Sequence, residues 1–195
     1  MTLLRSRAHV HRIASASLAI ALAACSGSSS EEPAALDLNG FGAKYKIADN
    51  EIPGWTVSTE PAAFDLYSAE NLTDKIDGPA ANYVSHGCKY AMFEEMVGPT
   101  DPNEQYCRVI AMDFVTEPQA ASMVAYQRES SAGITAIPGY DASLVFGYPG
   151  LTGLTVYGNF GALYFEVILD GYPGDPDTAG QVGAKFLQVL QAKNK

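Results

Sequence analysis

The sequence predicts an α+β fold, a single domain in which an antiparallel sheet is packed by about three helices. Strand-like segments follow one another over short turns, which favours hairpins over the long crossovers that parallel strands need. Segments with apolar residues at helical spacing lie between and after these strands. The chain has 195 residues and is 47% hydrophobic, as expected for a globular protein of about one domain.

The first predicted elements are a short strand and a helix. Residues 52–57 contain a Pro-Gly turn that leads into a short strand, and Trp55 is expected in the core. A helix is expected to begin near Ser68. Gly78-Pro79 interrupts its apolar pattern, which leaves two alternatives, one bent helix or two short ones. Gly87 is the expected end. The apolar residues that define this helix are Leu72, Ile76, Ala80, Tyr83 and Val84.

A hairpin and a second helix are expected next. Residues 88–97 and 106–115 are rich in aromatic and aliphatic side chains, and the short loop between them predicts an antiparallel pair of strands. Thr116 is the predicted N-cap of the following helix, with Gln119 completing the capping pair and Gly133 ending the helix.

The stretch from Glu129 to Ala184 contains no Lys or Arg and holds the last predicted elements. Residues 158–161 are expected to form the turn between the last two strands. Asp177 or Thr178 is the predicted cap of a final helix. The three strands expected in this stretch are residues 144–148, 154–157 and 162–169.

The first 24 residues have the pattern of a signal peptide: three arginines, then an apolar run of about a dozen residues, which is shorter than the roughly 20 residues of a membrane span. The run ends in Leu22-Ala23-Ala24-Cys25, which resembles the bacterial lipobox. The resemblance implies cleavage before Cys25 and lipidation of its thiol and its new amino group.

The predicted organisation is therefore a signal peptide at 1–24, a lipidated Cys and flexible tether at 25–38, and one domain at 39–195. The expected partner is a lipid bilayer, bound through acylated Cys25. The protein is expected to be exported and anchored by lipid to the bacterial cell envelope. Ser26 rather than Asp follows the Cys, which in a Gram-negative organism favours the outer membrane, facing the periplasm.

The negative charge of the chain argues against partners with anionic surfaces. The leader carries three basic and no acidic residues, so the 171 residues that remain have 9 basic and 22 acidic side chains and a net charge of 9 − 22 = −13. Nucleic acid and anionic membrane surfaces are bound through Lys and Arg, so neither is expected as the main partner.

Two cysteines remain after Cys25, namely Cys88 and Cys107. An oxidising compartment would permit a disulfide between them, but the register of the hairpin is unknown, and two buried free thiols are the alternative. Because His86 lies two residues before Cys88, a Cys–His nucleophile is a further hypothesis, although no third orienting residue is evident.

The other candidate sites are sparse. His86 is the only histidine after the leader, which excludes a site of several histidines, and it is the one candidate for a catalytic base, with a structural role favoured. Glu94 and Glu95 would face opposite sides of a strand, which disfavours a catalytic carboxylate pair. No cofactor is expected. Three carboxylates near the last helix are candidate calcium ligands, although turn and capping roles fit them equally: Asp170, Asp175 and Asp177.

Three segments together resemble an uncharacterised family of secreted bacterial proteins. They are residues 71–83, 110–128 and 154–168, of which the first matches a Tyr-Ile-Asn-Gly-Ala-Ala-Glu-Tyr helix of that family. Asp77 stands where the family has Asn, and Pro79 where it has a small residue. The family has no established activity, so the resemblance supports the fold and implies no function.

The leading functional hypothesis is a membrane-anchored, non-catalytic domain for binding or envelope assembly, with an unknown protein or small molecule as ligand. One alternative is an envelope hydrolase that uses His86 with Cys88 or a nearby carboxylate. Another is a carrier that holds a small ligand in an aromatic pocket. Tyrosines that could line a glycan or peptide groove, although sheet pairing is the favoured role, are Tyr148, Tyr157, Tyr164 and Tyr172.

Overall fold

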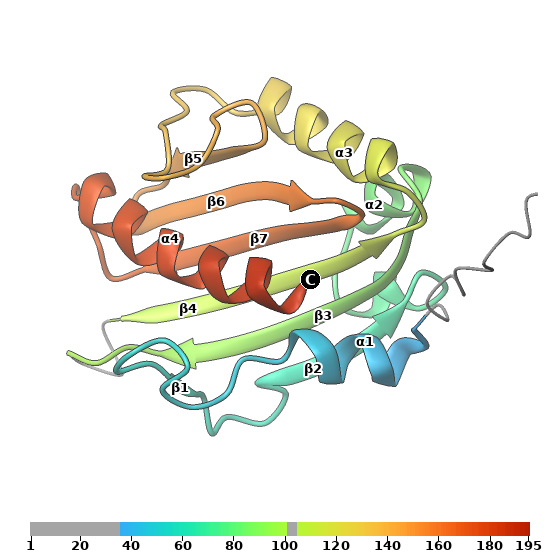
Figure 1. Ribbon diagram of the computed structural model, residues 1–195, viewed down its shortest axis with the longest axis horizontal. Coiled ribbons are helices and arrows are strands. Elements are labelled where there is room, and N and C mark those ends of the chain that lie inside the picture. Colours follow the sequence, from blue (N-terminus) through green and yellow to red (C-terminus); the bar gives the residue numbers. More distant parts are fainter. Residues whose placement is uncertain (1–35, 101–104) are drawn as a thin grey trace, which may run out of the picture. The chain divides into compact units, whose positions relative to one another are not determined.

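A computed structural model describes residues 36–100 and 105–195 (Figure 1). It contains one seven-stranded antiparallel sheet with the strand order β1-β3-β4-β7-β6-β5, in which β2 also pairs with β3. The strands are β1 (Thr56–Val57), β2 (Phe64–Ser68), β3 (Cys88–Val97), β4 (Tyr106–Phe114), β5 (Val145–Pro149), β6 (Gly153–Phe160) and β7 (Leu163–Asp170). The helices are α1 (Leu38–Tyr45), the 3-10 helix η1 (Leu72–Asp74), α2 (Ala80–Ser85), α3 (Glu117–Ser130) and α4 (Pro176–Lys193). The predicted α+β class is confirmed, with four α-helices where about three were expected.

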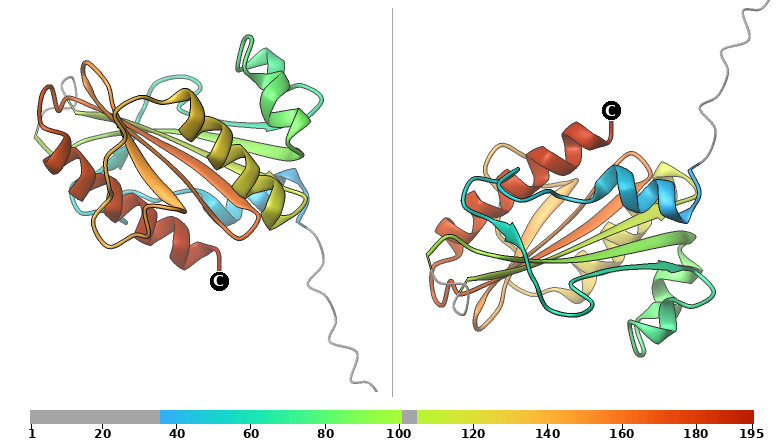
Figure 2. Two further views of the ribbon diagram at one scale, coloured as in Figure 1. Left: turned by 90° about the horizontal axis from the view of Figure 1, so that it is seen from above. Right: turned by 90° about the horizontal axis from the view of Figure 1, so that it is seen from below.

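Helices cover both faces of the sheet. Helices α1 and α4 lie on one side, and α2 and α3 lie on the other (Figure 2). Because side chains alternate along a strand, each face has its own apolar core. In β4, for example, Val109 and Ala111 belong to the core under α1 and α4, whereas Ile110 and Met112 belong to the core under α2 and α3.

The last helix packs closely on β6 and β7. A Cβ atom at Gly183 would lie 2.9 Å from Cγ2 of Val156, so the glycine permits this approach. The helix begins earlier than predicted, because the Asp175 carboxylate accepts a hydrogen bond from the backbone N–H of Thr178 at 3.0 Å. Asp175 is therefore the N-cap in place of Asp177 or Thr178, and Pro176 occupies the first turn.

The segment between α1 and β1 confirms the expectation for Trp55. Its side chain is buried, and its ring meets the ring of Phe186 edge to face, with 5.1 Å between the centroids. Trp55 thus attaches the chain before β1 to helix α4, on the face opposite α2 and α3.

The segment from residue 64 to 85 differs from the prediction at its start. Ser68 ends strand β2, and its backbone N–H donates to the Asn71 side chain at 2.8 Å. Two short helices, η1 and α2, follow on either side of Gly78-Pro79, which was one of the two alternatives. Val84 is 40% exposed, whereas three of the other predicted apolar residues are buried: Leu72, Ala80 and Tyr83.

The turn between the last two strands is shorter than predicted. Gly158 to Phe160 belong to β6, and the reversal occurs at Gly161, which has φ +58. At Gly158 a Cβ would lie 2.6 Å from the Phe165 ring, so packing against β7 is what requires glycine there. Helix α3 begins after Thr116 as predicted and ends three residues before Gly133.

No helix within residues 36–100 and 105–195 is both long and apolar enough to cross a membrane.

Candidate functional site

The face that carries α2 and α3 is covered over only part of its area. The helices pack on side chains from the end of the sheet where β3 begins and β4 ends, and these side chains are buried. Towards the other end of the same face the side chains are partly exposed. We call this uncovered part the open half, and its side chains are Glu95, Tyr106, Arg108, Tyr148, Thr155 and Ile168.

Five of these residues form one row across the sheet. The register pairs Glu95 with Arg108, Arg108 with Ile168, Ile168 with Thr155, and Thr155 with Tyr148. Neighbouring strands lie about 4.8 Å apart, so the row of five strands extends roughly 19 Å. It presents a carboxylate, a guanidinium, a methyl-rich side chain, two hydroxyl groups and an aromatic ring to solvent.

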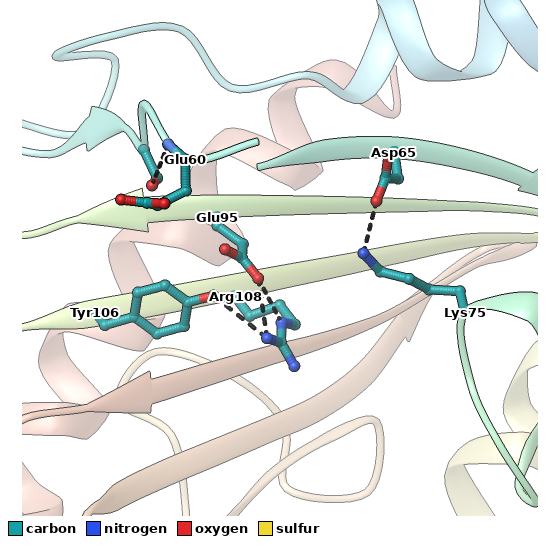
Figure 3. A network of polar contacts seen from close by, with 7 residues as sticks. Glu60, Asp65, Lys75, Glu95, Tyr106 and Arg108 are labelled. Atoms are coloured by element: carbon teal, nitrogen blue, oxygen red, sulfur yellow. Dashed lines mark hydrogen bonds and ion pairs between the residues drawn. The ribbon is translucent and has the colours of Figure 1, made fainter. Parts of the chain in front are cut away.

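A network of polar contacts orders the β3–β4 end of this row (Figure 3). Arg108 donates to Oε1 of Glu95 from Nη2 at 2.9 Å and from Nε at 3.3 Å, and from Nη2 to the Tyr106 hydroxyl at 3.4 Å. Burial alone would raise the pKa of Glu95, but the hydrogen bonds from Tyr106 and Arg108 outweigh it and lower that pKa. Burial and the bond to Glu95 raise the pKa of Tyr106 to about 12. Glu95 is therefore an anion and Tyr106 a neutral phenol near pH 7.

A second ion pair lies beside the first. Lys75, which follows η1, reaches Asp65 on strand β2 with 2.6 Å between Nζ and Oδ2 (Figure 3). The Lys75 ammonium also lies 5.5 Å from the centroid of the Phe93 ring. Arg108 and Lys75 thus each have a carboxylate partner within the sheet, whereas Arg128 of α3, on the same side, lies 4.5 Å from the Phe146 ring centroid and donates to the carbonyl group of Ala142.

Glu166 lies on β7 where the covered part of the face meets the open half. It is 5% exposed and pairs across the sheet with Tyr157 and Ile110. The hydroxyl groups of Tyr83 and Tyr164 both donate to its Oε1, at 2.5 and 2.8 Å. Burial raises the pKa of Glu166, and the two tyrosine hydroxyls oppose that shift.

The second oxygen of Glu166 has a different environment. Among the described residues, no hydrogen bond ends on Oε2 of Glu166, and the unpartnered side-chain oxygens enclosed away from solvent are Glu94 Oε1 and Asn159 Oδ1. Oε2 of Glu166 therefore accepts no hydrogen bond from the described part of the chain. A carboxylate oxygen in this position can accept a hydrogen bond from a ligand.

His86 lies between α2 and α3. It is the C-terminal cap of α2, its Nδ1 lies 3.1 Å from the Ser122 hydroxyl, and its ring lies 5.6 Å from that of Tyr126. Its recorded contacts thus lead to α3, and they join the two helices on the covered part of the face. The structural role that the sequence favoured for His86 stays a prediction.

Of the two alternatives for the cysteines, the structure has free thiols. Cys88 pairs with Phe114 and Cys107 with Met96, so they lie at opposite ends of the hairpin, roughly 26 Å apart at 3.3 Å per residue. They also face different cores, whereas a bridge needs Cα atoms within about 7 Å.

Burial also makes these thiols poor nucleophiles. It raises the pKa of Cys88 to about 12 and the pKa of Cys107 well above its ordinary value, with nearby carboxylates adding to both shifts. The thiolate is the reactive form of cysteine, so neither residue supplies a nucleophile near pH 7.

Two of the three candidate calcium ligands have other roles. The Asp170 carboxylate accepts a hydrogen bond from the Thr152 hydroxyl at 2.5 Å, Asp175 caps α4, and Asp177 is an exposed residue of the first turn of α4. Over residues 36–100 and 105–195, no group of three or more His, Cys, Asp or Glu could hold a metal ion. Cys25, the predicted lipidation site, lies outside the described residues.

The predicted opposition of Glu94 and Glu95 is found in β3. Glu95 belongs to the open half, whereas Glu94 is fully buried on the α1/α4 face, where its Oε2 accepts the Ile47 N–H at 2.8 Å. Burial raises the pKa of Glu94 to about 7, although that hydrogen bond and the charges of Lys46 and Lys193 oppose the shift.

The predicted group of tyrosines is divided by the sheet. Tyr148, Tyr157 and Tyr164 share the α2/α3 face, where Tyr164 is fully buried beneath the helices, and Tyr172 is buried in the opposite core. Arg108 and Glu166 did not stand out in the sequence. Both interrupt apolar strands at positions that an alternating pattern places on one face, and that interruption is the sequence feature that marks them.

Comparisons with known proteins add little to this geometry. No protein-family model matches the chain, and no curated protein matches it. Among solved structures, the extracellular domain of PknH from Mycobacterium tuberculosis is similar to this chain, with 14% sequence identity and a TM-score of 0.42 over 72% of this chain and 82% of that one.

Proposed function

We propose that this protein is a lipid-anchored envelope domain that binds a ligand on the open half of its sheet without transforming it. The row from Glu95 to Tyr148 is the observation that carries this proposal. Polar and aromatic side chains that stand partly exposed on a rigid sheet can bind a ligand without rearrangement, which reduces the entropic cost of binding.

The chemistry of the remaining groups supports binding over catalysis. The Ser122 hydroxyl beside His86 is a potential nucleophile, but among the described residues no carboxylate pairs with the imidazole to orient it, and the other neighbour of the ring is Tyr126. The two described thiols are buried and protonated. The side chains of the open half can donate and accept hydrogen bonds, as a binding site requires.

The binding proposal is tested by thermal unfolding in the presence of sugars, oligosaccharides, amino acids, short peptides and fatty acids. A ligand at about 100 times its Kd adds roughly 2.7 kcal/mol to the free energy of unfolding, so at least one class is expected to raise Tm. The shift is expected to be lost in Arg108→Gln and retained in Lys185→Ala, which removes an exposed positive charge from α4. A shift that persists in Arg108→Gln, or no shift with any class, would contradict the proposed site.

One experimental result would contradict the proposal that the protein is not catalytic. Turnover of an ester, peptide or glycoside that is present in the wild-type protein and lost in His86→Ala would favour the hydrolase instead.

Anchoring is supported by the lipobox-like sequence that ends at Cys25 and the polar tether that follows it. Expressed in a bacterium fed labelled palmitate, the full chain is expected to incorporate label and sediment with membranes, because several acyl chains bind a bilayer stably. Cys25→Ser is expected to lose both properties, and Ser26→Ala is expected to keep both. A Cys25→Ser chain that still carries label would contradict the anchor.

A further inference from the structure

We propose that the ligand of the open half is an uncharged oligosaccharide, bound across the strands, with Glu166 accepting one of its hydroxyl groups. This inference rests on the proposed function, because it names the chemical class of ligand for the same site.

The two ion pairs at the β3–β4 end of the row favour an uncharged ligand. Arg108 is neutralised by Glu95 at 2.9 Å, and Lys75 is neutralised by Asp65 at 2.6 Å. An anionic ligand would have to compete with these carboxylates for the cations, and it would approach a chain whose residues after the leader carry a net charge of −13 (9 − 22). The paired groups still have unused hydrogen-bonding capacity, since a guanidinium has five N–H donors and a carboxylate accepts at two oxygens.

The environment of Glu166 favours a ligand that can donate a hydrogen bond. Its Oε1 accepts hydrogen bonds from two tyrosine hydroxyls, whereas Oε2 accepts none from the described residues. A nearly buried side-chain oxygen without a protein partner gains free energy from a hydroxyl donor, because an unsatisfied buried acceptor is costly. A sugar hydroxyl meets this requirement and can accept a bond from a neighbouring side chain at the same time.

The aromatic residues supply the apolar contact that sugar rings need. Tyr148 is 37% exposed in the row, Tyr106 is half-buried beside Arg108, and Tyr157 is half-buried next to Glu166. Each combines a flat ring with a hydroxyl group, so it can pack on the C–H face of a sugar and still form a hydrogen bond. The row of roughly 19 Å is long enough for several sugar units.

The position of the row on a sheet face argues against an extended peptide. Peptides that add to a sheet pair with the free backbone groups of an edge strand. In the open half, β4, β6 and β7 are paired on both sides, so their backbone groups are engaged and only side chains remain for a ligand. Side-chain hydroxyl, carboxylate and guanidinium groups match the hydroxyl groups of a carbohydrate.

The test is calorimetric titration of the chain from residue 25 onward, carrying Cys25→Ser. Malto-, cello- and chito-oligosaccharides serve as the neutral probes. Oligogalacturonate and uncharged peptides serve as the anionic and non-carbohydrate arms. At least one neutral oligosaccharide is expected to bind, with affinity reduced about tenfold or more in Tyr148→Ala and in Glu166→Gln. The matched control is Tyr126→Ala, because Tyr126 is 39% exposed on α3 and lies outside the open half.

The outcomes separate this inference from the proposed function. If an anionic or peptide probe binds instead, and Arg108→Gln and Tyr148→Ala weaken it, the open half is the site and the carbohydrate inference is wrong. If oligosaccharide binding is unchanged in Tyr148→Ala, the ligand class stands and the site is wrong. If no probe of any class binds, both are overturned. Tyr148→Ala keeps the test valid even if Glu166→Gln fails to fold, because Tyr148 is exposed.

Discussion

Between pH 4.5 and pH 7.5 the free energy of unfolding of this protein is expected to fall by roughly 3 kcal/mol on account of Glu94 alone. The folded protein holds a proton on Glu94 up to about pH 7, because the side chain is fully buried, whereas the unfolded chain releases it near pH 4.5. In this window the folded state binds more protons than the unfolded state, so stability decreases as pH rises. Above about pH 7 both states are ionised and the loss is complete.

The measurement is urea unfolding at half-unit pH steps in the wild-type protein and in Glu94→Gln. The variant cannot ionise, so its stability is expected to vary less over the window, whatever the constant cost of the buried amide. Glu166 and the general acidity of the chain contribute a slope of the same sign to both proteins. Glu70→Gln, which removes an exposed carboxylate, is expected to follow the wild type. Parallel curves for wild type and Glu94→Gln would show that Glu94 ionises normally in the folded state.

Trp55→Ala is expected to destabilise the fold by about 3–5 kcal/mol. The indole is buried and forms the contact between the chain before β1 and Phe186 of α4, so truncation leaves a cavity that rigid neighbours cannot fill. Urea unfolding followed by far-ultraviolet circular dichroism measures the loss, since the only tryptophan is removed.

A double-mutant cycle with Phe186→Ala isolates the ring contact, and a coupling of about 0.5–1.5 kcal/mol is expected. Tyr126→Ala removes an exposed aromatic ring and is expected to cost much less. A loss below about 1 kcal/mol in Trp55→Ala would mean that the segment before β1 does not depend on this contact.

Local sequence patterns were sufficient for the central hairpin and the helices that follow it. In β3 and β4, both faces of each strand are apolar over most of their length, because helices cover both sides of the sheet. Such runs are recognisable without knowledge of their partners. Helix α3 likewise begins after Thr116 as predicted, although the Thr116 hydroxyl donates to Oε1 of Gln119 at 3.0 Å and caps no backbone N–H.

Helix α1 was not predicted, and the reason is tertiary. Gly40 and Gly42 lie within its eight residues and weaken the intrinsic preference for helix. A Cβ at Gly42 would lie 2.6 Å from the Leu66 side chain, so close packing on β2 requires glycine where helix propensity disfavours it. Asp37 compensates at the N-cap by accepting the Gly40 N–H at 2.7 Å.

The open half could not be predicted for a different reason. Its row joins residues from β3, β4, β5, β6 and β7, and each neighbour is set by register. A shift of one residue in any ladder would turn that strand's members to the other face. The sequence indicated that Glu94 and Glu95 diverge, but only the register shows that Glu95 meets Arg108 and that Glu94 is enclosed.

The strand order also has a consequence for how the chain folds. The β1–β3, β2–β3 and β3–β4 ladders form within one continuous part of the sequence, and the β5–β6 and β6–β7 ladders form within another. Only the ladder between β4 and β7 joins these two parts among the described strands, and it closes a loop that contains α3. Local hairpins form within microseconds, whereas closing a long loop is opposed by chain entropy. Docking of β7 on β4 is therefore the step that we expect to limit the folding rate.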